Sequence, residues 1–151
     1  MLGRLKVTEI KETALLIENA AKLHGHLGPF LVIGVRMGEL AKRHLQVDDK
    51  TNCRLEVNIK TPFFTPFSCV IDGIQASTSC TVGNRKLKIE NSAKEITAQF
   101  RIQNSKKTVT ISVNPKIAET LVSEMSKGAN ARQLAAKIAH MEEEQLFVLE
   151  K

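Results

Sequence analysis

The chain has 151 residues, with 42% hydrophobic residues, 25% charged residues and a formal net charge of +6. These values are typical of one ordinary globular domain, and no apolar run approaches the roughly 20 residues that cross a bilayer. We therefore expect one soluble domain over residues 1–151 and no membrane partner. Three cysteines without a recognisable signal peptide favour a reducing compartment, so we expect a cytoplasmic protein.

The positive net charge admits an acidic partner, but its distribution does not define a nucleic-acid-binding surface. The 22 Lys and Arg residues are spread along the chain, and the densest local group is Arg85, Lys86 and Lys88. The sequence contains no RNA-recognition motif and no zinc-finger spacing, and its aromatic residues do not alternate with basic ones. We expect no nucleic-acid partner.

The first two predicted helices meet at a turn that contains two histidines. Apolar residues recur at helical spacing from Thr8 to His24, and His24 lies on the same inward face. Pro29 suits the first turn of a second helix, which we expect to reach His44. The intervening turn places His26 among glycines, and imidazole is both the commonest metal ligand and the usual acid–base group near neutral pH.

The second helix carries a pair of glycines, and a strand and an aromatic loop follow it. Gly34 and Gly38 lie four residues apart and predict a groove into which another element packs closely. Apolar and polar residues alternate from Cys53 to Lys60, which predicts a half-buried strand with Cys53 on its buried face. Residues 61–67 contain two prolines and three phenylalanines, and we expect them to line a pocket or a partner surface.

A short third helix is predicted from Cys69 to Thr78, with Ser68 as its N-cap. A thiol in the first turn of a helix faces free backbone N–H groups, so we expect a lowered pKa for Cys69. Asp72 lies one turn further on the same face, where it could orient an imidazole or hold a metal-bound water. Cys80 follows where the chain leaves the helix.

The remainder of the chain predicts mainly strands, followed by two helices. We expect strands over residues 86–90, 95–103, 108–113 and 145–149, and helices over residues 115–127 and 130–140. Helices, then a cluster of strands, then helices again predict an α+β fold with a largely antiparallel sheet.

The nitrogen and sulfur donors form a set that zinc prefers. We expect His24, His26, Cys69 and Cys80 as metal ligands, with zinc or another divalent transition metal bound. The catalytic candidates are Cys69, His26 and Asp72. Two alternatives stay open, because no local motif specifies a zinc site: these side chains are ordinary core residues, or Cys69 and a histidine form a metal-free nucleophilic pair.

Two separated blocks of the sequence resemble the core domain of the FmdE family, which is named after a component of formylmethanofuran dehydrogenase. The first is His24-Gly25-His26-Leu27-Gly28-Pro29, and the second runs from Cys69-Val70-Ile71-Asp72-Gly73-Ile74-Gln75 to Ser79-Cys80-Thr81-Val82-Gly83-Asn84. The resemblance implies an α+β core and a site that contains His24, His26, Cys69, Asp72 and Cys80. It does not include the zinc finger that some members carry after the core.

The chain departs from the family pattern at three positions. A family cysteine in the first block falls on Gly28, and two glycines of the second block fall on Ser79 and Arg85. The substitution at Gly28 removes one soft ligand from the expected site.

The resemblance also implies partners and a role. It implies an intertwined homodimer, for which the Phe63–Phe64 loop and the C-terminal helices offer surfaces, and association with a metalloenzyme as a partner. We therefore expect an accessory or metal-handling, zinc-binding domain linked to formylmethanofuran dehydrogenase-type enzymes. The alternatives are a metal-dependent enzyme that uses His24, His26 and Cys69, and a metal-free protein- or nucleic-acid-interaction module.

Overall fold

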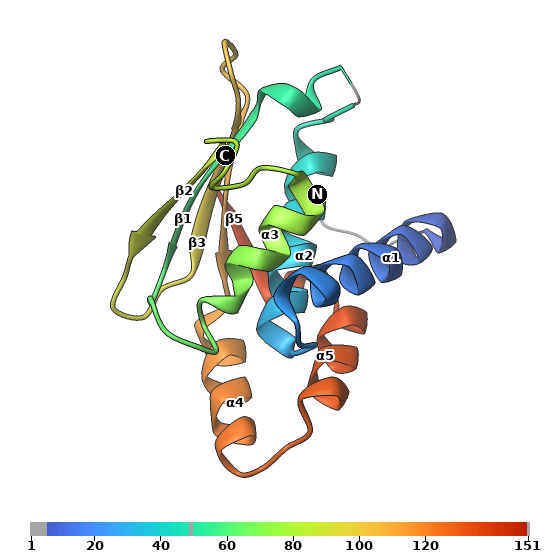
Figure 1. Cartoon of the computed structure of the whole chain (residues 1–151), viewed down its shortest axis with the longest axis vertical. Helices are drawn as coiled ribbons and strands as arrows, with labels where there is room; N and C mark the ends of the chain where they lie inside the picture. The colour runs from blue at the N-terminus through green and yellow to red at the C-terminus, as the bar shows by residue number, and fades with distance from the viewer. Residues whose placement is uncertain (1–5, 49, 151) are drawn as a thin grey trace.

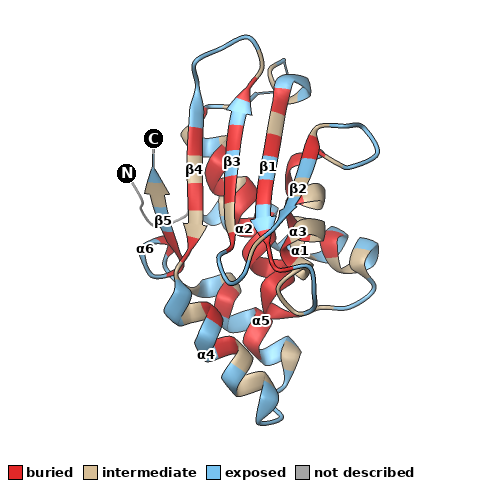
Figure 2. Cartoon of the chain, turned by 90° about the vertical axis from the view of Figure 1, so that its left-hand side faces the viewer, coloured by how far each residue is buried: buried red, intermediate tan, exposed pale blue. Residues whose placement is uncertain are grey.

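The computed structural model describes residues 6–48 and 50–150. Its helices pack on one face of a five-stranded sheet (Figure 1 and Figure 2). The helices are α1 (Val7–His24), α2 (Pro29–His44), α3 (Cys69–Thr78), α4 (Pro115–Ser126), α5 (Ala131–His140) and α6 (Glu143–Leu146), and a 3-10 turn covers Asn52–Arg54. The strands are β1 (Leu55–Thr61), β2 (Leu87–Asn91), β3 (Thr97–Ile102), β4 (Thr108–Val113) and β5 (Phe147–Glu150).

The sheet has the strand order β2-β1-β3-β4-β5 and is largely antiparallel. Only the pairing of β1 with β2 is parallel among the described strands, and α3 lies in the crossover that connects them. A parallel pair needs such a crossover because its strands must start at the same end of the sheet. The predicted α+β fold is therefore confirmed. None of the helices within residues 6–48 and 50–150 is long and apolar enough to cross a membrane.

One face of the sheet forms the core, as the alternating burial along the strands shows (Figure 2). Leu55, Val57 and Ile59 of β1 are buried, as the alternation predicts. The expectation for Cys53 is wrong: it is exposed and lies in the 3-10 turn before β1. The apolar–polar alternation continues through this turn, but the extended backbone that turns alternation into burial begins only at Leu55.

Glycines allow α2 and α3 to come into backbone contact, which confirms the groove predicted at Gly34 and Gly38. A Cβ atom on Gly34 would lie 2.2 Å from the carbonyl oxygen of Val70, and one on Gly73 would lie 2.2 Å from that of Leu31. Real Cβ atoms do not approach so closely, so only glycine fits at these points. This contact brings the beginning of α2 close to the beginning of α3.

Candidate functional site

A cavity of about 330 Å³ lies where the histidine turn meets the start of α3. His24, His26 and Cys69 all line it, so the structure brings together three of the four predicted ligands. The rest of its wall is largely apolar and comes from three segments of the chain: residues 28–31, residues 65–66 and Met125 of α4.

Local sequence signals place both imidazoles at this cavity. Helix α1 ends at His24 because Gly25 adopts a left-handed conformation, with φ +86°, and its N–H donates to the carbonyl of Ala21 at 2.7 Å. The chain then turns through His26, and Pro29 begins α2 in the position that proline favours. The two histidines therefore flank a fixed break between helices.

His24 is held by a carboxylate on the neighbouring helix. Its Nδ1 atom lies 2.7 Å from Oδ2 of Asp72, and the two side chains are 20% and 32% exposed. A carboxylate oxygen only accepts hydrogen bonds, so Nδ1 carries a hydrogen; in the neutral imidazole the lone pair then lies on Nε2. The contact places Asp72 beside the His24 ring, where the sequence analysis expected it to orient an imidazole.

Cys69 lies at the start of α3, as predicted, but its thiol is not acidic. Burial raises the pKa of Cys69, and the negative charge of Asp72 raises it further. The N–H groups of residues 69–71 donate to the carbonyls of residues 66–68 at 3.1–3.3 Å. The turn before the helix therefore occupies the donors that were expected to stabilise a thiolate, and the expectation of a lowered pKa is wrong.

Cys80 does not line this cavity. It is 1% exposed beyond the far end of α3, and its Sγ donates to the carbonyl of Leu55 at 3.2 Å. The helical rise separates the two ends of α3 by about 15 Å. Burial also raises the pKa of Cys80. The structure therefore places Cys80 in the core beside β1 and not with the other three candidates.

The donors at the cavity fit a transition metal in kind, because imidazole and thiol are ligands that zinc prefers. Their present arrangement does not enclose an ion: within the described residues, no three His, Cys, Asp or Glu side chains form a group that could hold a metal. A Cβ atom added to Gly28 would lie 3.5 Å from the His26 ring, in ordinary contact with it. The space that the family cysteine would use is therefore beside His26.

A larger groove lies on the other side of the aromatic loop. It measures about 890 Å³ and is lined by Phe64 and Phe67 of the loop, by the 93–97 segment and by α4. The expectation that the loop lines a pocket is thus confirmed. Phe67 contacts Phe30 edge to face, with ring centroids 5.4 Å apart, and Phe30 lines the histidine cavity. One ring of this pair thus lines the groove and the other lines the histidine cavity.

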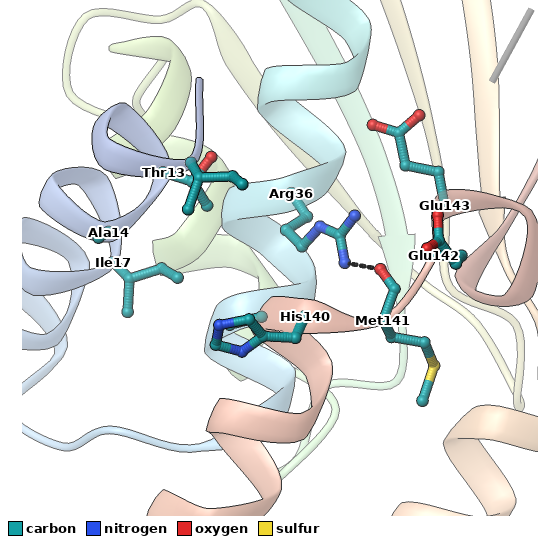
Figure 3. Close-up of a pocket in the computed structure, with 10 residues that line it drawn as sticks. Thr13, Ala14, Ile17, Arg36, His140, Met141, Glu142 and Glu143 are labelled. Carbon is teal, nitrogen blue, oxygen red and sulfur yellow. Dashed lines mark hydrogen bonds between the residues drawn. The ribbon is translucent and has the colours of Figure 1, made fainter. Parts of the chain in front are cut away.

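The cavity in Figure 3 lies between α1, α2 and the α5–α6 junction and measures about 310 Å³. Arg36 is 5% exposed there, and its guanidinium donates to the carbonyls of Ile138, at 2.9 Å, and Met141. Burial lowers the pKa of Arg36. Arg36 thus satisfies carbonyls at the end of α5, which is a structural role that the sequence did not reveal.

Sequence reasoning missed Gln75, which extends the contacts of Asp72. Its Nε2 donates to Oδ1 of Asp72 at 2.9 Å, and its Oε1 accepts from the N–H of Val82 at 3.1 Å. Two signals in the sequence could have identified it: Gln75 belongs to the second block that resembles the family, and it lies three residues after Asp72, which places both on one helix face.

Taken together, the fold and the cavity define an α+β domain with an imidazole–thiol pocket at a helix–helix joint. The chain matches the family described as FmdE, Molybdenum formylmethanofuran dehydrogenase operon, over residues 23–148. The chain belongs to this family, and the resemblance read from its two sequence blocks is confirmed.

A match to one curated protein covers a smaller segment. Over 77 residues, the chain is 36% identical to a probable S-adenosyl-L-methionine-binding protein from Archaeoglobus fulgidus. The match covers 51% of this chain and 20% of that protein. The chain therefore spans about a fifth of this relative's length.

Proposed function

We propose that this domain binds a single transition-metal ion, with zinc as the first candidate, through His24, His26 and Cys69. It acts as an accessory or metal-handling component associated with formylmethanofuran dehydrogenase-type metalloenzymes, as the description of its family suggests. The observation that carries the proposal is the His24–Asp72 hydrogen bond beside the cavity that His26 and Cys69 also line. Carboxylate-bound imidazoles of this kind are typical metal ligands.

The proposed ligand set differs from the expected one in a single residue. Cys80 is left out because its buried thiol is bonded to β1 and does not reach the cavity. Asp72 is not a ligand in this proposal but accepts a hydrogen bond from Nδ1 of His24. Because the three donors do not enclose an ion in their present arrangement, binding requires that their side chains move closer together. Free cysteines, one of them exposed, fit a reducing compartment such as the cytoplasm.

Elemental analysis of protein purified without chelator tests this proposal. We expect about one metal ion per chain in the wild type. We expect His26→Ala and Cys69→Ser to lose this ion, because each substitution removes one of the three proposed ligands. Cys53→Ser is the matched control, since Cys53 is an exposed thiol outside the cavity. If both site variants keep the wild-type metal content and a native circular dichroism spectrum, the metal does not bind in this cavity.

A metal-dependent reaction at the same site is the second candidate. Three protein ligands leave a coordination position open, and the cavity of about 330 Å³ leaves room beyond them. An accessory role and a catalytic role are distinguished by assaying the metal-loaded protein for hydrolysis of activated esters. Turnover that is lost in Cys69→Ser together with the metal favours catalysis.

We also propose that a second copy of the chain covers the groove beside the aromatic loop. Phe64, which lines the groove, is 58% exposed, and its neighbour Phe63 is 56% exposed; exposed aromatic clusters mark interaction sites. Sedimentation velocity tests the homodimer: Phe64→Ser should weaken it, whereas Leu15→Ser, at an exposed apolar residue of α1, should not. A wild-type chain that sediments as a monomer contradicts this part of the proposal.

A further inference from the structure

We infer that Gln75 is a positioning residue that fixes the orientation of His24 at the proposed metal site. The inference rests on the proposed function in that it concerns the same cavity, but it is carried by hydrogen bonds that exist without any ion. The contacts form a continuous series from the cavity through Asp72 and Gln75 to the backbone of Val82.

The hydrogen-bonding groups determine the direction of every step in this series. The backbone N–H of Val82 can only donate, so the Gln75 atom that it meets must be the amide oxygen. The amide nitrogen of Gln75 therefore faces Asp72 and donates to Oδ1 at 2.9 Å. This leaves Oδ2 of Asp72 to accept from Nδ1 of His24 at 2.7 Å.

Gln75 thus restrains both the position and the rotation of the Asp72 carboxylate. Asp72 is 32% exposed, so without a second partner its side chain could rotate toward water. With Oδ1 held by Gln75, the carboxylate plane is fixed and Oδ2 stays directed at His24. The consequence is that His24 keeps its hydrogen on Nδ1 and presents Nε2 to the cavity.

The far end of the series is anchored in a turn that is itself well bonded. The side chain of Asn84 accepts from the N–H groups of Thr81 and Lys86 at 3.0 and 3.1 Å and donates to the carbonyl of Ser79 at 2.7 Å. Val82 lies inside this turn. A series of hydrogen bonds therefore links the turn after α3, which forms part of the second sequence block, to the His24 imidazole of the first block.

Nitrogen NMR of the histidine rings in the metal-free protein, at a pH where the imidazoles are neutral, tests the inference directly. In the wild type we expect His24 to be the Nδ1–H tautomer. In Gln75→Leu we expect a mixture with the Nε2–H tautomer, because the Asp72 carboxylate is no longer held. Gln103→Leu is the matched control, since the Gln103 amide also donates to a carboxylate, that of Glu56, away from the cavity.

A second variant separates positioning from folding. Gln75→Glu retains an acceptor for the Val82 N–H but loses the donor to Asp72, so we expect the same change of tautomer with an intact fold. An unchanged His24 tautomer in either folded variant overturns the inference, because the donor from Gln75 to Asp72 is its central link.

Affinity for Co²⁺, used as a spectroscopic probe, gives an independent readout. Loss of a group that orients a ligand lowers metal affinity by about 10-fold or more, so we expect a loss of that size in both Gln75 variants and none in Gln103→Leu. If the wild type binds no Co²⁺, the proposed metal function fails while the tautomer experiment still decides the role of Gln75. If Co²⁺ binds with equal affinity to all the variants, the inference is overturned and the metal function stands.

Discussion

The backbone contact between α2 and α3 can be tested by adding one methyl group at Gly34. In Gly34→Ala, the new Cβ atom would lie 2.2 Å from the carbonyl oxygen of Val70 and 3.0 Å from the Cα atom of Gly73. Both neighbours are backbone atoms, so no side-chain rotation can relieve the clash. The helices must separate locally by about 1 Å to restore ordinary contact, which loosens a closely packed interface.

The expected loss of stability follows from two opposing effects. Overpacking a core with one extra methyl group costs about 3 kcal/mol when the neighbours cannot move freely. Alanine in a helix interior is favoured over glycine by about 1 kcal/mol, which offsets part of the loss. We therefore expect Gly34→Ala to lower the free energy of unfolding by about 2 kcal/mol, equivalent to about 4–8 °C in melting temperature for a chain of this size.

Urea unfolding followed by far-UV circular dichroism measures this difference, since the chain has neither Trp nor Tyr for fluorescence. Gly83→Ala is the control, because its nearest neighbour is 3.8 Å from the added Cβ atom and its backbone is not left-handed. We expect that variant to lie within about 0.5 kcal/mol of the wild type. Equal stabilities for the two variants would refute the argument that backbone contact requires glycine at position 34.

Three further predictions concern stability. Ser79 has φ +62°, a left-handed backbone conformation that costs a residue with a side chain about 1–2 kcal/mol. Ser79→Gly should therefore stabilise the protein by about 0.5–1 kcal/mol, after subtraction of the larger conformational entropy that glycine loses on folding. A less stable variant would show that contacts of the serine side chain stabilise the protein by more than this backbone strain costs. Arg43 pairs with the buried carboxylate of Glu143, and Arg43→Met should cost about 2 kcal/mol because it removes this ion pair and leaves only the coulombic attraction of Arg36; an unchanged melting temperature would argue against the pair. Burial raises the pKa of Glu39, so the folded state favours its neutral form. The stability that protonated Glu39 contributes is fully present below the ordinary Glu pKa and is lost as the pH rises through the pKa of the folded state. Glu39→Gln should therefore be more stable than the wild type at pH 7 and equal to it at low pH, as measured by urea titrations. The opposite pH trend would contradict the assignment.

Helix boundaries and the joint between them could be predicted because the signals are local. Gly25 and Pro29 determine where α1 ends and α2 begins through their own backbone preferences. That Asp72 faces an imidazole could be anticipated in part, since His24 lies on a predicted inward face and Asp72 shares a helix face with Cys69, although the sequence did not name His24 as its partner. What the sequence did not reveal is the second partner of Asp72, because an amide at Gln75 can face many neighbours until the turn at Val82 is placed.

The expectations for the burial of Cys53 and for the pKa of Cys69 were wrong because each applied a rule for a regular strand or helix at a position where the neighbouring turn decides the outcome. Cys53 continues the alternating pattern of β1 but lies in a turn, where alternation has no consequence for burial. Cys69 begins a helix, yet the turn formed by residues 64–68 occupies the donors at its start. In each case the deciding factor is the conformation of the segment just before a regular element, which periodicity does not encode.

The packing that builds the core also assembles the candidate site, so the two are not independent. Gly34 and Gly73 bring α2 against α3, and Gly73 directly follows Asp72 in the chain. The same contact therefore fixes how far the Asp72 carboxylate lies from the histidine turn that begins α2. A sequence that keeps the glycine contact therefore also keeps His24, His26 and Cys69 around one cavity. The cavity at the histidine turn is therefore present although glycine stands at position 28, where the family pattern has cysteine.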